Sequence, residues 1–231
     1  VSARLGHPNI VTVYDRGEYD GLLYISMEYI EGRTLHTILK DQGALGLGYA
    51  VSILAPLCKA LDFAHNQGAV HRDIKPPNVM RSSRGSVIID FGASLMIGSQ
   101  EERITRQSTP LTVQYASPEQ LQGQQVSGFS DIFSMGLTLS FAALGHPLFK
   151  AETLGEMVHR IINDEPDLDL LDPAQQSFLR SLLKKNPAER PTIWQVAKYV
   201  QQAHKPRRKT RETRLPGGET HGKSISTASD R

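Results

Sequence analysis

Residues 71–78 read His-Arg-Asp-Ile-Lys-Pro-Pro-Asn, and Asp90-Phe91-Gly92 begins twelve positions after the last of them. Phosphoryl transfer needs an acceptor for the proton of the attacking hydroxyl, a cation near the transferred phosphate and oxygen ligands for magnesium. Asp73 can accept the proton, and Lys75 can neutralise charge on the γ-phosphate. Asn78 and Asp90 supply the oxygen atoms that a hard cation prefers. The two segments therefore predict about half of an active site for phosphoryl transfer.

Three further segments follow in order. They are Ser117-Pro118-Glu119, Ser130-Asp131-Ile132 at the start of an apolar helix, and the run from Asn186 to Pro191. With these segments, the chain from residue 1 to about residue 204 resembles the eukaryotic-type protein serine/threonine kinase family, and Tyr115 to Gln120 are similar to its bacterial members. The resemblance implies an α+β kinase-like fold, with a mostly helical large lobe behind a hinge and the last strands of a small lobe.

The resemblance also implies the reaction and its cofactors. The γ-phosphoryl group of ATP would pass to a serine or threonine hydroxyl of a protein. Asp73 and Lys75 would be catalytic, with Asn78 and Asp90 as magnesium ligands. Lys75 favours serine/threonine over tyrosine substrates, and Thr112 supports this because the family places a threonine there that contacts the catalytic pair.

A hinge is expected at Met27-Glu28-Tyr29-Ile30. By resemblance, the Glu28 carbonyl and the Ile30 N–H would read the polar edge of adenine. Met27 would guard the back of the pocket and Met80 would form its floor. Both methionines can equally be ordinary core residues, and the two interpretations are compatible.

Some of the family's residues have structural roles. His71 and Phe91 are expected in a stack between the lobes, with Asp131 holding the backbone of His71. Glu119 and Arg190 are expected to form a buried ion pair.

A regulatory switch is also implied by the resemblance. Arg72 would clamp a phosphorylated residue of the following segment, because a guanidinium can bind phosphate through two hydrogen bonds. The candidate phosphorylation sites between residues 98 and 112 are Thr105, Ser108, Thr109 and Thr112. Hydroxyl residues are common in polar loops, so the choice among these sites stays open.

Hydrophobic periodicity and turn signals predict the individual elements. Strands are expected at residues 11–14, 22–27 and 86–89, with hairpin-turn chemistry at Asp20-Gly21. A short helix is expected at 34–40 and a buried helix from about residue 50 to 66. Another helix begins at a Ser130 cap and ends at Gly145, and further helices are expected at 152–163, 174–183 and 192–204.

The chain has 231 residues, enough for one sizeable core, and its single cysteine, Cys58, excludes an intramolecular disulfide. No run of about 18 apolar residues predicts a membrane span, so a cytoplasmic location is expected, with no nucleic-acid partner. Residues 1–204 carry a net charge of −3 and residues 205–231 a net charge of +5. This Ser/Thr-rich basic tail is expected to be disordered. It would be either a solvated linker or, as in similar bacterial receptor kinases, a segment that contacts anionic lipid beside a span of a longer parent.

The family's glycine-rich loop and strand lysine have no counterpart before the hinge. We therefore expect the domain at residues 1–204 to lack most of its small lobe and to be inactive by itself. The alternative is a non-catalytic, kinase-like binding module. A small-molecule kinase is the third possibility, which the Ser-Pro-Glu segment and Arg190 disfavour.

Overall fold

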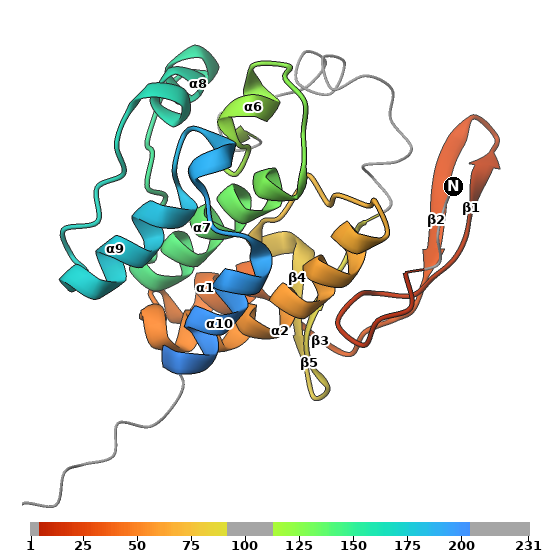
Figure 1. The fold of residues 1–231 in the computed structure, drawn as a ribbon. Coiled ribbons are helices and arrows are strands. Elements are labelled where there is room, and N and C mark those ends of the chain that lie inside the picture. The colour runs from red at the N-terminus through yellow and green to blue at the C-terminus, as the bar shows by residue number, and fades with distance from the viewer. Residues whose placement is uncertain (1–4, 92–112, 204–231) are drawn as a thin grey trace, which may run out of the picture.

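The computed structural model describes residues 5–91 and 113–203 of the chain. It has a helical lobe with a small sheet, and a two-stranded hairpin that stands beside the lobe (Figure 1). The α+β architecture follows the prediction from the sequence. The predicted tail at residues 205–231 lies outside the described residues.

The hairpin consists of β1 (Val13–Tyr19) and β2 (Leu22–Met27), which pair in antiparallel register from Val13 opposite Met27 to Tyr19 opposite Leu22. Asp20 and Gly21 form the turn with φ of 52° and 75°. Two successive positive φ angles belong to the tight hairpin turns that the Asp-Gly sequence predicts. The first strand begins and ends later than predicted, because backbone pairing with β2 extends it through a polar stretch that has no apolar alternation.

A three-stranded antiparallel sheet adjoins residues 71–78, which carry the predicted catalytic residues and are called the catalytic segment below. Its strand order is β3 (Gly32–Thr34), β4 (Val79–Ser82) and β5 (Gly85–Ile88). Sequence patterning predicted only β5, at residues 86–89. β3 has three residues, and its Gly32 lies so close to the carbonyl oxygen of Arg81 that a Cβ atom would collide with it. A strand of three residues that begins with glycine is too short to show an alternation of apolar and polar residues in the sequence.

The core of the lobe is built on α2 (Leu47–Asn66), against which α7 (Gly128–Leu144) and α10 (Ile193–Ala203) pack. The side chains of this core are almost completely buried. They include Ile53, Leu57, Leu61, Ile132, Leu179 and Val196. α2 precedes the catalytic segment directly, and α7 lies beside it. The two central helices therefore fix the position of that segment from both sides.

The other helices surround this core. They are α1 (Leu35–Gln42), η1 (Pro76–Asn78), α6 (Pro118–Leu121), α8 (Leu154–Asn163), α9 (Pro173–Leu182) and η2 (Pro187–Glu189). The predicted cap of α7 was wrong by three residues. Ser127 is the N-cap, and Ser130 lies one turn into the helix, where its hydroxyl accepts from the Ser127 N–H.

By length and composition alone, α2 is apolar enough to cross a membrane, and 56% of its most apolar window is buried inside the lobe. A core helix of this length passes the same test as a membrane span. Packing against α7 and α10 accounts for its apolar side chains. We therefore treat α2 as the core helix that the sequence predicted.

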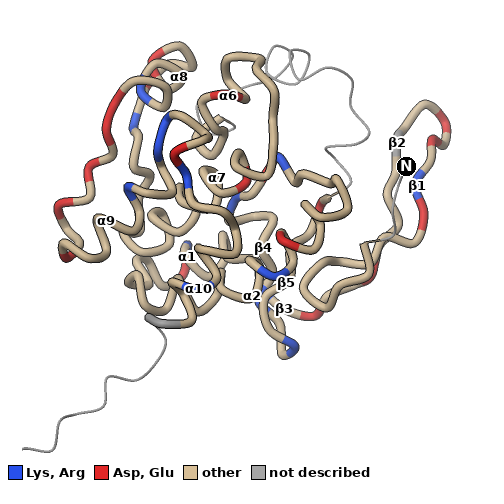
Figure 2. Tube along the Cα trace, in the orientation of Figure 1, with Lys and Arg blue, Asp and Glu red and all other residues tan. Residues whose placement is uncertain are grey.

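Charged residues are distributed unevenly over the lobe (Figure 2). Acidic residues follow one another along the connection from α8 to α9: Asp164, Glu165, Asp167, Asp169 and Asp172. Asp172 caps α9 by accepting from the N–H of Gln175, so this member is used structurally. The connection lies away from the catalytic segment in the ribbon view (Figure 1).

Candidate active site

The backbone of the catalytic segment is held from below by one carboxylate. Asp131, fully buried in the first turn of α7, accepts hydrogen bonds from the N–H of His71 at 2.9 Å and from the N–H of Arg72 at 2.7 Å. Its Oδ2 atom also lies 2.8 Å from Nε2 of His65, at the end of α2. Asp131 thus holds the backbone of His71, as the resemblance implied, and that of the next residue as well.

His71 links the segment to the strand end that carries Asp90. Its Nδ1 atom accepts from the N–H of Asp73 at 3.2 Å, and its Nε2 atom lies 3.1 Å from the carbonyl oxygen of Ile89. Because Nδ1 accepts a hydrogen bond, the proton of the neutral ring is on Nε2. This N–H can then donate to the carbonyl oxygen of Ile89. The His71 ring packs edge-on against Phe91 with centroids 4.6 Å apart. His71 and Phe91 are therefore in contact as expected, but edge to face rather than stacked, and their position between two lobes stays a prediction.

Asp73, Lys75 and Asn78 meet at the surface of the lobe. The Lys75 ammonium lies 2.8 Å from Oδ2 of Asp73, and the side chains of both residues are 27% exposed. The Asn78 amide donates to the same carboxylate oxygen at 3.0 Å and to the Asp73 carbonyl oxygen at 2.9 Å. The predicted cation and amide therefore both contact the predicted proton acceptor, Asp73 and Lys75 are partly open to solvent, and Asn78 is buried.

Asp90 lies next to Asn78 because the β4–β5 pairing continues beyond both strands. The N–H of Ile89 donates to the carbonyl oxygen of Asn78 at 2.9 Å. Asp90 follows with φ of 70°, a left-handed conformation that costs free energy in a residue other than glycine. The backbone thus brings together two residues whose side chains carry the hard oxygen donors that Mg²⁺ prefers, and their role as magnesium ligands stays a prediction.

The predicted ion pair of Glu119 and Arg190 is present and buried. The two terminal guanidinium nitrogens of Arg190, Nη1 and Nη2, donate to Glu119 at 2.6 and 2.8 Å, and Ser130 donates to the same carboxylate at 2.6 Å. The remaining N–H groups of Arg190 donate to three backbone carbonyls, those of Phe129, Lys184 and Lys185. Burial would raise the pKa of Glu119, but the hydrogen bonds from Arg190 and Ser130 outweigh it and lower that pKa.

The hinge residues lie between the hairpin and β3. Ile30 is buried with Val11 and Val87, and Met80 packs partly buried against this cluster, whereas Met27 is 37% exposed. The Glu28 N–H donates to the Thr12 carbonyl at 2.8 Å, and an ion pair with Arg84 lowers the pKa of the Glu28 carboxyl. Met80 is thus partly buried, whereas Met27 is open to solvent. The predicted roles of both residues at the adenine pocket stay predictions.

Arg72 combines a strained backbone with a buried guanidinium nitrogen. Its φ is 68°, and its Nε atom is buried without a hydrogen-bond partner in the part of the chain that the structure describes. A buried donor without a partner costs free energy, and the phosphate-binding role of Arg72 stays a prediction. The predicted phosphorylation sites Thr105, Ser108, Thr109 and Thr112 lie outside the described residues.

Two residues that the sequence analysis did not select contact the catalytic segment, and a third, His65, contacts Asp131, which holds that segment. The His65 ring reaches Asp131, and Gly128 is required beside it because a Cβ atom there would come within 2.6 Å of the ring. Thr138 donates to the Ile74 carbonyl at 3.2 Å, and Gln120 donates to the Arg72 carbonyl at 2.8 Å. Only the packing of distant segments brings these side chains to the loop, so no local pattern could have found them.

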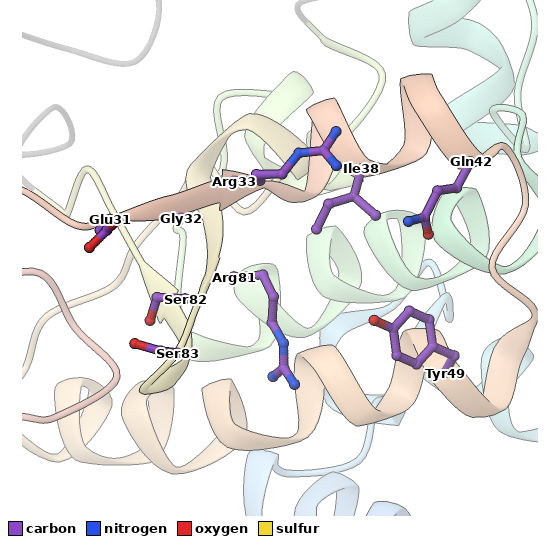
Figure 3. Close-up of a pocket in the computed structure, with 9 residues that line it drawn as sticks. All are labelled: Glu31, Gly32, Arg33, Ile38, Gln42, Tyr49, Arg81, Ser82 and Ser83. Carbon is purple, nitrogen blue, oxygen red and sulfur yellow. The ribbon is translucent and has the colours of Figure 1, made fainter.

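A groove of about 490 Å³ opens elsewhere, between β3, the β4–β5 turn, the middle and C-terminal end of α1 and the first turn of α2 (Figure 3). Arg33, Arg81 and Tyr49 project around it. Arg33 is paired with Asp41. None of the predicted catalytic or magnesium-binding residues lines this groove. It is therefore separate from the candidate active site.

The comparison with family models decides the identity of this arrangement, because the protein kinase domain model matches residues 1–201. The chain belongs to the protein kinase family. Serine/threonine-protein kinase PknB of Mycobacterium tuberculosis (strain ATCC 25618 / H37Rv) is 36% identical over 171 residues, which cover 71% of this chain and 27% of that protein. The kinase of the same name from Mycolicibacterium smegmatis is 34% identical over 201 residues, covering 82% of this chain and 32% of that protein.

A probable serine/threonine-protein kinase of Corynebacterium efficiens is 34% identical over 171 residues, which cover 71% of this kinase chain and 26% of the relative. The chain thus spans about a third or less of the length of these three curated relatives. The family matches the resemblance seen in the catalytic motifs. The similarity to bacterial members, suggested by Tyr115 to Gln120, agrees with these relatives.

Proposed function

We propose that this kinase domain belongs to a protein serine/threonine kinase that transfers the γ-phosphoryl group of ATP to protein hydroxyls. The observation that carries the proposal is the contact among Asp73, Lys75 and Asn78 beside Asp90. A pseudokinase could dispense with this constellation. The names of the bacterial relatives support the substrate class.

In the proposed reaction, the hydroxyl oxygen of the protein substrate attacks the γ-phosphorus, and the bond from that phosphorus to the β–γ bridging oxygen breaks. Asp73 orients the hydroxyl and accepts its proton, and ADP leaves. The Lys75 ammonium, held 2.8 Å from Asp73, lies where it can stabilise the transferred phosphate. Asn78 and Asp90 would hold magnesium, which neutralises phosphate charge when it is bound.

The test replaces Asp73 with Asn in the longest natural protein that contains this chain. Turnover of a generic serine/threonine acceptor with Mg-ATP should fall by about 100-fold or more, because proton transfer and alignment both suffer. Asp169→Asn, a change to an exposed aspartate on the α8–α9 connection, is the matched control and should leave turnover unchanged. Equal turnover in Asp73→Asn and the wild type would refute the assignment.

We also propose that residues 1–231 by themselves transfer phosphate poorly. Before the hinge, the described residues provide two strands, and the sequence provides no glycine-rich loop or strand lysine for the phosphates. A calorimetric titration with ATP should therefore give weak or unmeasurable affinity. Micromolar affinity together with turnover above background would contradict this proposal.

A further inference from the structure

The peptide bond between Arg72 and Asp73 has separate partners at its two ends. Its N–H, which belongs to Asp73, donates to Nδ1 of His71. Its carbonyl oxygen, which belongs to Arg72, accepts from Nε2 of Gln120 at 2.8 Å. This peptide unit leads directly into Asp73, so its orientation helps to set where that carboxylate points.

Gln120 reaches the loop from another part of the chain. It lies in α6, 48 positions after Arg72, and it is 9% exposed. Its Oε1 atom accepts from both the N–H and the hydroxyl of Ser117, each at 3.0 Å. The amide is thereby fixed in one orientation, with the oxygen towards Ser117 and the nitrogen towards Arg72.

The loop is otherwise held by α7 and by its own residues. Asp131 and Thr138 come from α7, and Asn78 closes the loop on itself. Within the described part of the chain, the side-chain hydrogen bond from Gln120 connects the backbone of residues 71–74 to the segment that includes Ser117 and Glu119. Arg72 has φ of 68°, so its backbone needs such restraints to remain in place.

We infer that Gln120 is a positioning residue, which transmits the geometry of the Ser117–Leu121 turn through the Arg72–Asp73 peptide to the Asp73 carboxylate. A change in the conformation of that turn would move the Gln120 amide that donates to the Arg72 carbonyl. The orientation of the Asp73 carboxylate would change with it. The structural contact stands by itself, whereas its effect on turnover rests on the proposed kinase function.

Hydrogen exchange of the Asp73 amide in the full 231-residue chain tests the coupling without any turnover. Gln120→Leu keeps most of the volume but removes both the donor to the Arg72 carbonyl and the acceptor for Ser117, so these groups lose that partner. The Asp73 amide should then exchange about 5- to 100-fold faster. Gln122→Leu, at an exposed glutamine in the same turn, is the matched control and should exchange like the wild type.

Gln120→Glu supplies a readout that general destabilisation would not move. An ionised carboxylate can accept from Ser117 but cannot donate to Arg72, whereas a protonated carboxyl can do both. We therefore compare the exchange rate of the Asp73 amide in Gln120→Glu with its rate in the wild type at the same pH. The ratio of the two rates should exceed one at neutral pH and approach one as the pH falls. Unchanged exchange in Gln120→Leu, or equal acceleration of amides throughout α2 and α7, would overturn the inference.

The catalytic consequence is measured in the longest natural protein that contains this chain. Gln120→Leu should lower kcat by about 10-fold or more and leave the KM for ATP near its wild-type value, since Gln120 contacts the catalytic loop and not the hinge. An unchanged kcat would overturn the positioning role. A wild-type protein without phosphotransfer would refute the proposed function alone, and the exchange experiment would still decide whether Gln120 orders the Asp73 peptide.

Discussion

The catalytic loop and the β1–β2 hairpin are held in very different ways. Backbone groups from residue 71 to residue 75 bond to buried side chains of α6 and α7, to His71 and to Asn78. The hairpin pairs mainly with itself, and its Tyr19 and Leu22 are 80% and 73% exposed. The half of the site that would receive the substrate hydroxyl is preorganised, whereas an isolated two-stranded hairpin is marginally stable.

This difference has a physical origin in where each region meets the core. The loop lies between α2 and α7, whose buried surfaces provide most of the packing in the lobe. The hinge end of the hairpin touches the lobe through a small cluster that contains Val11, Ile30 and Val87. Substitutions in the lobe should therefore change global stability, and equivalent substitutions in the hairpin should not.

The largest expected effect comes from the ion pair of Glu119 and Arg190. Arg190→Leu should lower the free energy of unfolding by about 3–5 kcal/mol, because it leaves the Glu119 carboxylate buried without its partner. Urea denaturation followed by circular dichroism measures this change. The control is Arg160→Leu, which breaks the solvent-exposed pair with Glu156 and should change the free energy of unfolding far less, because solvent screens that pair. Equal losses in the two variants would contradict the assigned burial.

Lys185 gives the lobe a pH dependence. Burial lowers its pKa from 10.5 to about 8, while its ammonium donates to the Ile161 carbonyl at 2.6 Å and lies 4.9 Å from the Phe149 ring centroid. Between pH 8 and 10.5 the unfolded chain holds this proton and the folded chain releases it, so stability should rise across that range. Chemical denaturation at several pH values should show the rise in the wild type and in Lys184→Met, and a smaller rise in Lys185→Met.

The smallest effect is expected at the hinge. Tyr29 is 89% exposed, so Tyr29→Ala should change the unfolding free energy by no more than about 0.5 kcal/mol. The matched variant is Tyr115→Ala, which removes a ring that is 9% exposed and packs with the cluster around Phe133. That change should cost about 3–5 kcal/mol. A large loss in Tyr29→Ala would mean that the hinge is more tightly integrated into the lobe than its exposure indicates.

The sequence predicts that the candidate catalytic residues lie near one another, because most of them are close together in the chain. Asp73, Lys75 and Asn78 occupy one loop, and Asp90 follows the next strand pair, so spacing alone places them together. The buried ion pair of Glu119 and Arg190 was accessible only through the resemblance, since 71 positions separate its partners.

Other features could not be predicted for definite physical reasons. β3 and β4 are three and four residues long, too short for a periodic signal. Ser130 looks like a cap because Asp131 follows it, yet Ser127 begins the helix and Ser130 completes the capping box. Gln120 and His65 act through contacts made by distant segments, and such tertiary contacts leave no mark on local sequence.

The most direct test of the contrast is hydrogen exchange with mass spectrometry on the wild-type 231-residue chain. Peptides covering residues 70–80 should exchange slowly, close to the protection of α2 and α7, because buried side chains hold their backbone. Peptides covering residues 13–27 should exchange much faster, through local opening that leaves the lobe folded. Equal protection of the two regions, or faster exchange in the catalytic loop than in the hairpin, would contradict the account.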